Sequence, residues 1–209
     1  MNPILLLFAA YLIGGIPFGY LLVRWSTGGD VRTQGSGNIG ATNVLRTTGK
    51  TLGMVTLLLD IGKGALAVWL MDWATEGHAL WTALAALAVI VGHAFPVFLK
   101  FQGGKAVATF VGAFLYLTPA PLFAIVILFV AVLGTTKYVS LASMVGALLF
   151  PLACWLLVQP PPPIMVAAIV GGAFIIWRHR ANWHRLRAGS ENVLSFAKRN
   201  EPLEGGRGG

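Results

Sequence analysis

The chain has 209 residues, of which 56% are hydrophobic and only 11% are charged, and its formal net charge is +8. Its mean hydropathy of +0.76 excludes a single soluble core beneath a solvated surface and indicates a polytopic membrane protein. In a membrane protein, positive charge first indicates how the loops are oriented, so no nucleic-acid partner is expected. The single cysteine, Cys154, lies in an apolar run, cannot form an intrachain disulfide and is expected to be packing material.

Apolar windows between breaks of glycine, proline and charge predict an all-α polytopic membrane protein with seven transmembrane helices. In chain order the predicted helices are 4–23, 51–71, 79–98, 105–117, 120–136, 139–158 and 163–180. No basic residue precedes Arg24, so the first segment lacks the basic region of a signal peptide and is retained as a helix. The fourth helix is short for a full span and is expected to lie partly inside the bundle. Residues 1–200 are expected to form one membrane domain, followed by a disordered tail at 201–209.

Among the loops, lysine and arginine occur only in one alternate set. The opposite loops, 72–78, 118–121 and 159–163, contain neither residue. The positive-inside rule therefore predicts an N-terminus outside the membrane and a C-terminus in the cytoplasm. Lys63 is the one basic residue well inside a predicted span, and Asp60 precedes it by one helical turn. We interpret the two as an i,i+3 ion pair facing the bundle, with a role beside a substrate as the alternative.

The sequence GSGNIG at residues 35–40 matches the dinucleotide-binding pattern G-x-G-x-x-G. That pattern needs a preceding strand and a following crossover helix within a βαβ unit, whereas both flanking segments here are apolar and long enough to be helices. A nucleotide loop is therefore not predicted. The glycines serve either close helix packing or a ligand site, and for this loop alone both interpretations remain open.

Three polar, glycine-containing stretches fall on the predicted cytoplasmic side, at residues 35–46, 92–109 and 177–191. Each combines glycines, which let backbone amides face a ligand, with cations and small polar side chains. In the second stretch, the Gly-Gly-Lys sequence at 103–105 opens the predicted fourth helix, where free amides favour an anion. Together these are the components of a phosphate site.

A simpler interpretation is that the glycines pack helices, while the cations set orientation and contact lipid head groups. Orientation needs only the cations, but the three stretches also contain Ser36, Asn38, Asn43, His93, Asn182 and Glu191. This combination favours a binding site. No Cys or His cluster has metal-ligand spacing, no carboxylates pair for acid–base work, and no G-x-S-x-G motif occurs, so neither metal-dependent nor serine hydrolysis is predicted.

At these residues the chain resembles the bacterial acyl-phosphate:glycerol-3-phosphate acyltransferases, integral enzymes of phospholipid synthesis. The family's three motifs occur in order as GSGNIGATNVLR, GHAFPVFLKFQGGKAVAT and HRANWHRLRAGSE. Among the departures, Gln102 stands where the family often has a basic residue, Lys100 and Ala106 where glycine is common, and Trp183 where an aliphatic residue is usual. The resemblance implies an active site facing the cytoplasm in the bacterial inner membrane. No cofactor motif is present, so none is expected to be needed.

The implied reaction moves a fatty acyl group from acyl phosphate to the 1-hydroxyl of sn-glycerol 3-phosphate, giving lysophosphatidic acid and inorganic phosphate. Our hypothesis assigns Ser36 and Asn182 to orient the acceptor and His93 to hold or stabilise the developing charge. The proton passes to a substrate phosphate, because an acyl phosphate already has a stable leaving group. His93 as an obligatory base and an acyl-enzyme on Ser36 are the alternatives.

The expected substrate- and phosphate-binding residues are Gly37, Asn38, Thr42, Asn43, Arg46, Gly103, Gly104, Lys105, Ser143, His179, Arg180, Arg185 and Glu191. No metal is assigned to them. The expected partners are acyl phosphate, glycerol 3-phosphate and membrane lipid. The sequence does not fix the acyl chain length or the oligomeric state, although a monomer is favoured.

Two other functions fit the same residues in part. An organic-phosphate transporter would use the same cationic pocket without chemistry, but it should be accessible from both sides, and the outer loops offer no matching anion site. A structural or assembly protein would bind anionic lipid through its basic loops. That alternative leaves the placement of Ser36, His93 and Asn182 unexplained.

Overall fold

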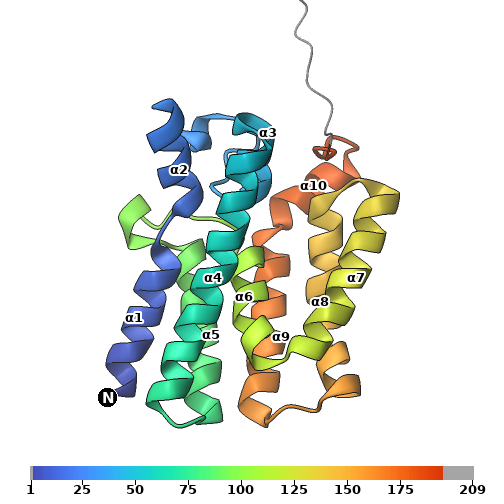
Figure 1. Ribbon diagram of the computed structural model, residues 1–209. Coiled ribbons are helices and arrows are strands. Elements are labelled where there is room, and N and C mark those ends of the chain that lie inside the picture. The colour runs from blue at the N-terminus through green and yellow to red at the C-terminus, as the bar shows by residue number, and fades with distance from the viewer. Residues whose placement is uncertain (1, 195–209) are drawn as a thin grey trace, which may run out of the picture.

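The computed structural model describes residues 2–194, and every regular element in that range is helical (Figure 1). In chain order the elements are α1 (Pro3–Gly15), α2 (Phe18–Thr27), the 3-10 turn η1 (Val31–Thr33), α3 (Ala41–Thr48), α4 (Lys50–Ala74), α5 (Ala79–Ala94), the 3-10 turn η2 (Val97–Leu99), α6 (Val107–Leu117), α7 (Pro119–Thr136), α8 (Val139–Leu157), α9 (Pro162–Arg178) and α10 (Arg180–Arg187). The predicted disordered tail lies outside the described residues.

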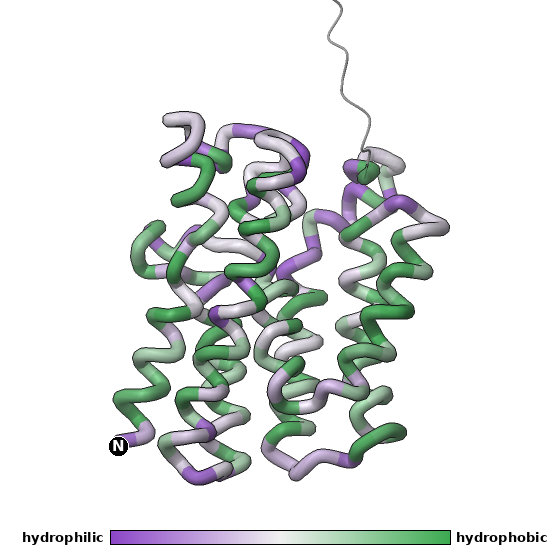
Figure 2. The backbone as a smooth tube through the Cα atoms, in the orientation of Figure 1, coloured by the Kyte–Doolittle hydropathy of each residue, from purple (hydrophilic) through white to green (hydrophobic). Residues whose placement is uncertain are grey.

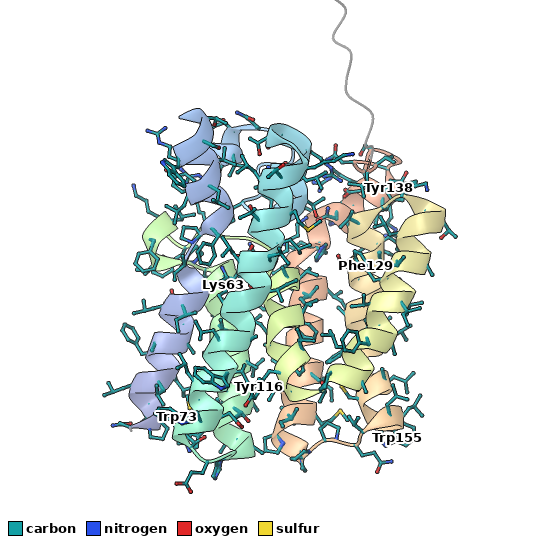
Figure 3. The ribbon with its side chains drawn as sticks, viewed as in Figure 1. Lys63, Trp73, Tyr116, Phe129, Tyr138 and Trp155 are labelled. Atoms are coloured by element: carbon teal, nitrogen blue, oxygen red, sulfur yellow. The ribbon has the colours of Figure 1, made fainter. Side chains whose placement is uncertain are left out.

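The long helices run side by side, while α2, α3 and α10 gather at the end of the bundle opposite the N-terminus (Figure 1). Hydrophilic residues concentrate at that same end and in the short connections at the other (Figure 2). Trp73 and Trp155 lie toward the N-terminal end and Tyr138 toward the α10 end, which is where interfacial aromatic residues are enriched (Figure 3).

The number of spans differs from the prediction of seven. Within the described residues, five helical segments are long and apolar enough to cross a membrane, and α9 with α10, bent by 52°, gives a sixth. The remaining candidate, α6, has only 11 residues. It starts at Val107 and not at 105, because Ala106 adopts a left-handed conformation with φ of 62° that delays the helix. The expectation of a short fourth helix is confirmed, but seven full spans are not.

The first predicted helix is broken. Pro17 has no amide to donate and restricts the residue before it, so α1 ends at Gly15 and α2 begins at Phe18. The break frees the carbonyl oxygen of Ile16, which accepts a hydrogen bond of 2.8 Å from the ammonium group of Lys63 on α4. The predicted i,i+3 ion pair is confirmed, with 2.8 Å between Lys63 Nζ and Asp60 Oδ1. Figure 3 shows Lys63 between the two ends of the bundle.

Small residues let the helices approach closely. A Cβ atom at Gly112 on α6 would collide with the carbonyl oxygen of Ile61 on α4, and one at Gly14 on α1 would collide with the carbonyl oxygen of Val89 on α5. This is the packing typical of membrane helices, where backbone contact replaces hydrophobic driving force. Cys154 is buried and free, as expected of a packing residue.

Candidate active site

All three polar stretches contribute to one cavity of about 430 Å³. Its polar lining comes from the loop before α3, from the start of α8, from Lys105 and from the region around α10. Its apolar lining comes mainly from within α6, α7 and α8. The cavity therefore joins a polar site near one end of the bundle to an apolar space among the helices.

The predicted site residues divide into two groups. Those that line the cavity are Ser36, Asn38, Thr42, Asn43, Arg46, His93, Lys105, Ser143, His179, Asn182 and Glu191. Those that do not line it are Gly37, Gly103, Gly104, Arg180 and Arg185. The second group still lies close by: Arg185 pairs with a lining residue, the paired glycines hold the loop before Lys105, and Gly37 forms a turn with φ of 70°. Arg180 instead places its guanidinium carbon over the ring of Trp177, 4.7 Å from the ring centre.

Asn43 organises the first stretch. Its side-chain oxygen accepts a hydrogen bond of 2.8 Å from the amide of Ser36, and its side-chain nitrogen donates to three backbone carbonyls of the loop, those of Val31, Gln34 and Asn38. The glycines on either side of Ser36 both have positive φ, which only glycine adopts without strain. The loop thus presents Ser36 at the cavity, while Asn43 is a structural centre with no free amide for a ligand.

Arg46, on the short helix α3, reaches the cavity with part of its hydrogen-bonding capacity unused. Its Nη2 donates to the carbonyl oxygen of Asn192 at 3.1 Å, whereas its buried Nε has no partner among the described residues. Burial lowers the pKa of the guanidinium, although the group remains charged at any physiological pH. An unpaired buried guanidinium donor is a favourable contact for an anion.

Glu191 organises the third stretch. Its Oε1 accepts hydrogen bonds from Ser140 Oγ at 2.9 Å and from Asn182 Nδ2 at 2.7 Å, and its Oε2 accepts one from Arg185 Nε at 2.8 Å. Burial alone would raise the pKa of this carboxyl, but the three donors outweigh it and the pKa lies below the usual value. Glu191 thereby fixes the amide nitrogen of Asn182, and the buried Oδ1 of the same amide has no partner among the described residues.

His179 is fixed in one tautomer. Its Nδ1 lies 2.8 Å from the carbonyl oxygen of Ile175 on the preceding turn of α9. A carbonyl can only accept, so Nδ1 carries the proton and Nε2 of the neutral ring is an acceptor. The buried ring lines the cavity beside the α9–α10 bend.

Lys105 is the second cation at the cavity. Its pKa is lowered to about 8, first by burial and then by the neighbouring cations Arg185, Arg46 and Arg178, while Glu191 acts in the opposite sense. Glu191 is the one carboxylate that perturbs this ammonium group among the described residues. Around Lys105 the cations Arg185, Arg46 and Arg178 therefore outnumber the carboxylate of Glu191, and this part of the site favours an anion.

His93 lines the cavity from the last turn of α5. It is 4% exposed, its Nδ1 lies 3.6 Å from Asp60 Oδ1, and a side chain at Gly104 would collide with its Nε2. Its ring thus supports the backbone of the loop that leads to Lys105. Asp60 also lines the cavity, so the alternative of a role near the substrate remains open for the Asp60–Lys63 pair.

Ser140 lines the cavity and donates to Glu191, but it was not among the residues predicted from the sequence. A serine on an apolar helix usually bonds to its own backbone, as Ser143 does to Val139, so nothing local distinguishes the two hydroxyls. The spacing of three residues does place both on one face of α8, which is a weak indication that they share an environment.

A family model described as glycerol-3-phosphate acyltransferase matches residues 4–189. Among curated glycerol-3-phosphate acyltransferases, that of Geotalea daltonii is 42% identical over 193 residues, covering 92% of this chain and 98% of the relative. That of Desulforamulus reducens is 43% identical over 198 residues, covering 95% and 98%.

Two solved structures are similar as well. The crystal structure of PlsY (YgiH), an integral membrane glycerol 3-phosphate acyltransferase, in its glycerol 3-phosphate form has a TM-score of 0.88 and 35% identity, with 93% of this chain and 96% of that chain covered. Its lysophosphatidic acid form has a TM-score of 0.85 and 34% identity, with the same coverage.

Proposed function

The chain belongs to the glycerol-3-phosphate acyltransferase family, an enzyme family of phospholipid biosynthesis, and from this premise we propose how its cavity carries out the reaction. The proposed donor is acyl phosphate, the acceptor is the 1-hydroxyl of sn-glycerol 3-phosphate, and the products are lysophosphatidic acid and inorganic phosphate. The observation that supports this best is the convergence of Arg46, Lys105 and an unpaired Asn182 oxygen on one cavity.

The cations address the main electrostatic problem of the reaction. Both substrates carry phosphate, so bringing them together means overcoming the repulsion between two anions. Arg46 offers an unpaired Nε, and Lys105 offers an ammonium group held by burial near the same space. Arg185 does not line the cavity, but it pairs with the lining residue Glu191 and adds positive charge nearby.

The hydroxyl of the acceptor is the group that Asn182 and Ser36 suit best. The Asn182 Oδ1 is a buried acceptor, and a substrate hydroxyl is a donor that would satisfy it. The 1-hydroxyl oxygen of glycerol 3-phosphate then forms a bond to the acyl carbon, while the bond from that carbon to the oxygen of the donor phosphate breaks. The departing phosphate keeps the bonding electron pair and takes the proton, so no strong protein base is needed.

The apolar part of the cavity suits the fatty acyl chain. One face of α7 supplies lining residues at helical spacing: Leu122, Ile125, Val126, Phe129 and Leu133. Phe129 is labelled in Figure 3. The chain can thus remain among the helices, close to the lipid in which acyl phosphate partitions, while its phosphate reaches the polar site.

We further propose that the chain crosses the bacterial inner membrane seven times as a monomer, with its N-terminus outside and its active site facing the cytoplasm. In that arrangement α6 is a short span inside the bundle. Support comes from the basic residues that gather at the end carrying α3 and α10, and from opposite connections that lack lysine and arginine.

The family relationship does not support the organic-phosphate transporter, and one experiment separates it from acyl transfer. Proteoliposomes containing the purified protein are given labelled glycerol 3-phosphate with and without palmitoyl phosphate. We expect conversion of the label to a lipid only when palmitoyl phosphate is present. Accumulation of unmodified label in the lumen would instead indicate transport.

A further inference from the structure

Arg178, the last residue of α9, makes three hydrogen bonds to the loop that leads to Lys105. Its Nε and Nη2 donate to the carbonyl oxygen of Gly104 at 3.1 Å and 2.8 Å, and the same Nη2 reaches the carbonyl oxygen of Gly103 at 3.2 Å. Its guanidinium also lies 5.1 Å from the ring centre of Phe95. Arg178 does not line the cavity, and its Nε and Nη2 donate to the loop.

The opposite side of the same loop rests on the end of α5. The amides of Gly103 and Gly104 donate to the carbonyl oxygens of Ala94 and His93 at 3.2 Å and 3.1 Å. Any side chain at Gly104 would collide with the His93 ring. The paired glycines are therefore held between the α5 terminus on one side and Arg178 on the other.

We propose that Arg178 is a positioning residue: by clamping the carbonyls of Gly103 and Gly104 it fixes the direction in which Lys105 presents its ammonium group to a substrate phosphate. This inference rests on the proposed function, in which Lys105 binds phosphate. Two consecutive glycines are the most mobile backbone that a chain can place before a binding residue, so the loop needs such a constraint. The planar guanidinium has several N–H donors in fixed directions and can bond both carbonyls at once. An ammonium group on a flexible side chain cannot reproduce that geometry.

The charges around Lys105 provide a separate measure of how close Arg178 lies to its ammonium group. Burial and the cations Arg185, Arg46 and Arg178 lower the pKa of Lys105 to about 8, and Glu191 opposes them. Removing the charge of Arg178 raises the pH at which Lys105 loses its proton. The charge of Arg178 acts on Lys105 through space, so this shift shows that the two groups are close, while the KM measurements separate positioning from a purely structural role.

The test uses the full-length protein in lipid, with Arg178→Gln and Arg178→Lys. The matched control is Arg24→Gln, because Arg24 also donates to a glycine carbonyl, that of Gly28, but lies on α2 away from the cavity. With palmitoyl phosphate and glycerol 3-phosphate as substrates, we expect Arg178→Gln to raise the KM of the substrate whose phosphate Lys105 binds by about tenfold, with a much smaller change in kcat. Arg178→Lys should raise the same KM less, and the control should match the wild type.

Two further measurements identify the route of the effect. In a Lys105→Ala background, Arg178→Gln should add little to the KM, since a residue that acts through Lys105 has nothing left to position. The alkaline limb of the profile of kcat/KM against pH should move upward in Arg178→Gln and stay in place in Arg178→Lys, which keeps the charge.

The inference would be overturned if Arg178→Gln raised the KM equally in the wild-type and Lys105→Ala backgrounds. It would also be overturned if Arg178→Gln lowered kcat in proportion to the folded fraction of the protein and left the KM unchanged. If Arg178→Gln does not fold, Arg178→Lys must still raise the KM, and an unchanged KM in that variant rejects the clamp. A Lys105→Ala variant with wild-type KM values would remove the phosphate site of the proposed function itself. The two failures are therefore distinguishable.

Discussion

Four residues that line the cavity carry a buried polar atom with no hydrogen-bond partner within residues 2–194. Asp60 Oδ1 and His93 Nδ1 lie 3.6 Å from each other, whereas Arg46 Nε and Asn182 Oδ1 are the two that suit a substrate. Burying such groups without a partner costs about 1–3 kcal/mol each, which a substrate phosphate and a substrate hydroxyl would recover on binding. Their availability depends on neighbours that occupy the other atoms of the same side chains. For Asn182 that neighbour is Glu191.

Glu191→Gln should lower kcat/KM by a factor between about 10 and 100, the loss expected when hydrogen bonds to a charged acceptor weaken. A glutamine side chain keeps the shape but brings its own donor toward Asn182 or Arg185, so Asn182 loses its fixed orientation. The control is Glu76→Gln, in the connection between α4 and α5. Steady-state kinetics that leave Glu191→Gln within a factor of two of the control would refute this role.

The rate should also depend on pH through Lys105. Because its pKa is about 8, Lys105 is cationic below that pH and neutral above it. Only the cation attracts phosphate, so kcat/KM should fall as the pH rises through about 8. Lys105→Arg, whose guanidinium keeps its proton, should lose this alkaline limb. A limb of the same midpoint in that variant would assign the titration to another group.

At the scale of elements, the apolar runs were sufficient to predict where the long helices lie, because their lengths and their proline and glycine boundaries are local properties. Pro17 could also have predicted the break in the first helix. The helices α3 and α10 were not predicted, since both lie inside polar motifs without a long apolar face. Contacts such as Ser140 with Glu191 join residues 51 positions apart and depend on packing that no local pattern contains.

The connection between η2 and α6 stores backbone strain at Lys100, an exposed residue with φ of 52°. A non-glycine residue in this left-handed region lowers the free energy of unfolding by roughly 1–2 kcal/mol, and glycine avoids that cost. Glycine has its own, smaller cost of about 0.5–1 kcal/mol, because its backbone has more conformational freedom in the unfolded chain. Lys100→Gly should therefore raise the unfolding midpoint slightly in detergent. Lys100→Val, β-branched at the same φ, should lower it. The reverse order of the two midpoints would show that the strain is absent.

The break between α1 and α2 should depend on the buried pair on α4. Lys63→Met removes the ammonium group that pairs with the charge of Asp60 and donates to the carbonyl of Ile16, and we expect it to destabilise the protein by about 3–5 kcal/mol. The double variant Asp60→Asn with Lys63→Met should recover part of that loss, because no unpaired charge remains. Chemical unfolding in detergent gives both values. Losses that simply add would mean that the two residues do not act as a pair.

At the scale of the whole molecule, the three motifs meet at one cavity although they are separated by long apolar helices. The predicted placement of all three on one side of the membrane already indicated this convergence. The closeness of the backbones follows from glycines at helix contacts, such as Gly14 and Gly112. Sequence alone did not distinguish residues that line the cavity from those that support it. Arg46 lines the cavity and Arg178 supports the loop before Lys105, and only three-dimensional contacts separate the two arginines.

The orientation of the molecule can be measured with single cysteines in a Cys154→Ala background. A cysteine at Gly28, beside α2, should react with a membrane-impermeant thiol reagent only when the cytoplasmic face is accessible. A cysteine at Glu76 should react from the opposite side. Labelling of both positions from the same side would contradict the proposed topology.

The most direct test measures release of inorganic phosphate by the purified protein in lipid, given palmitoyl phosphate with and without glycerol 3-phosphate, alongside Arg46→Ala and Lys105→Ala. We predict release that requires the acceptor, equals the amount of lysophosphatidic acid formed and falls strongly, to a rate that is still measurable, in both variants. Acceptor-independent release, or full activity in either variant, would contradict acyl transfer from acyl phosphate at this cationic cavity.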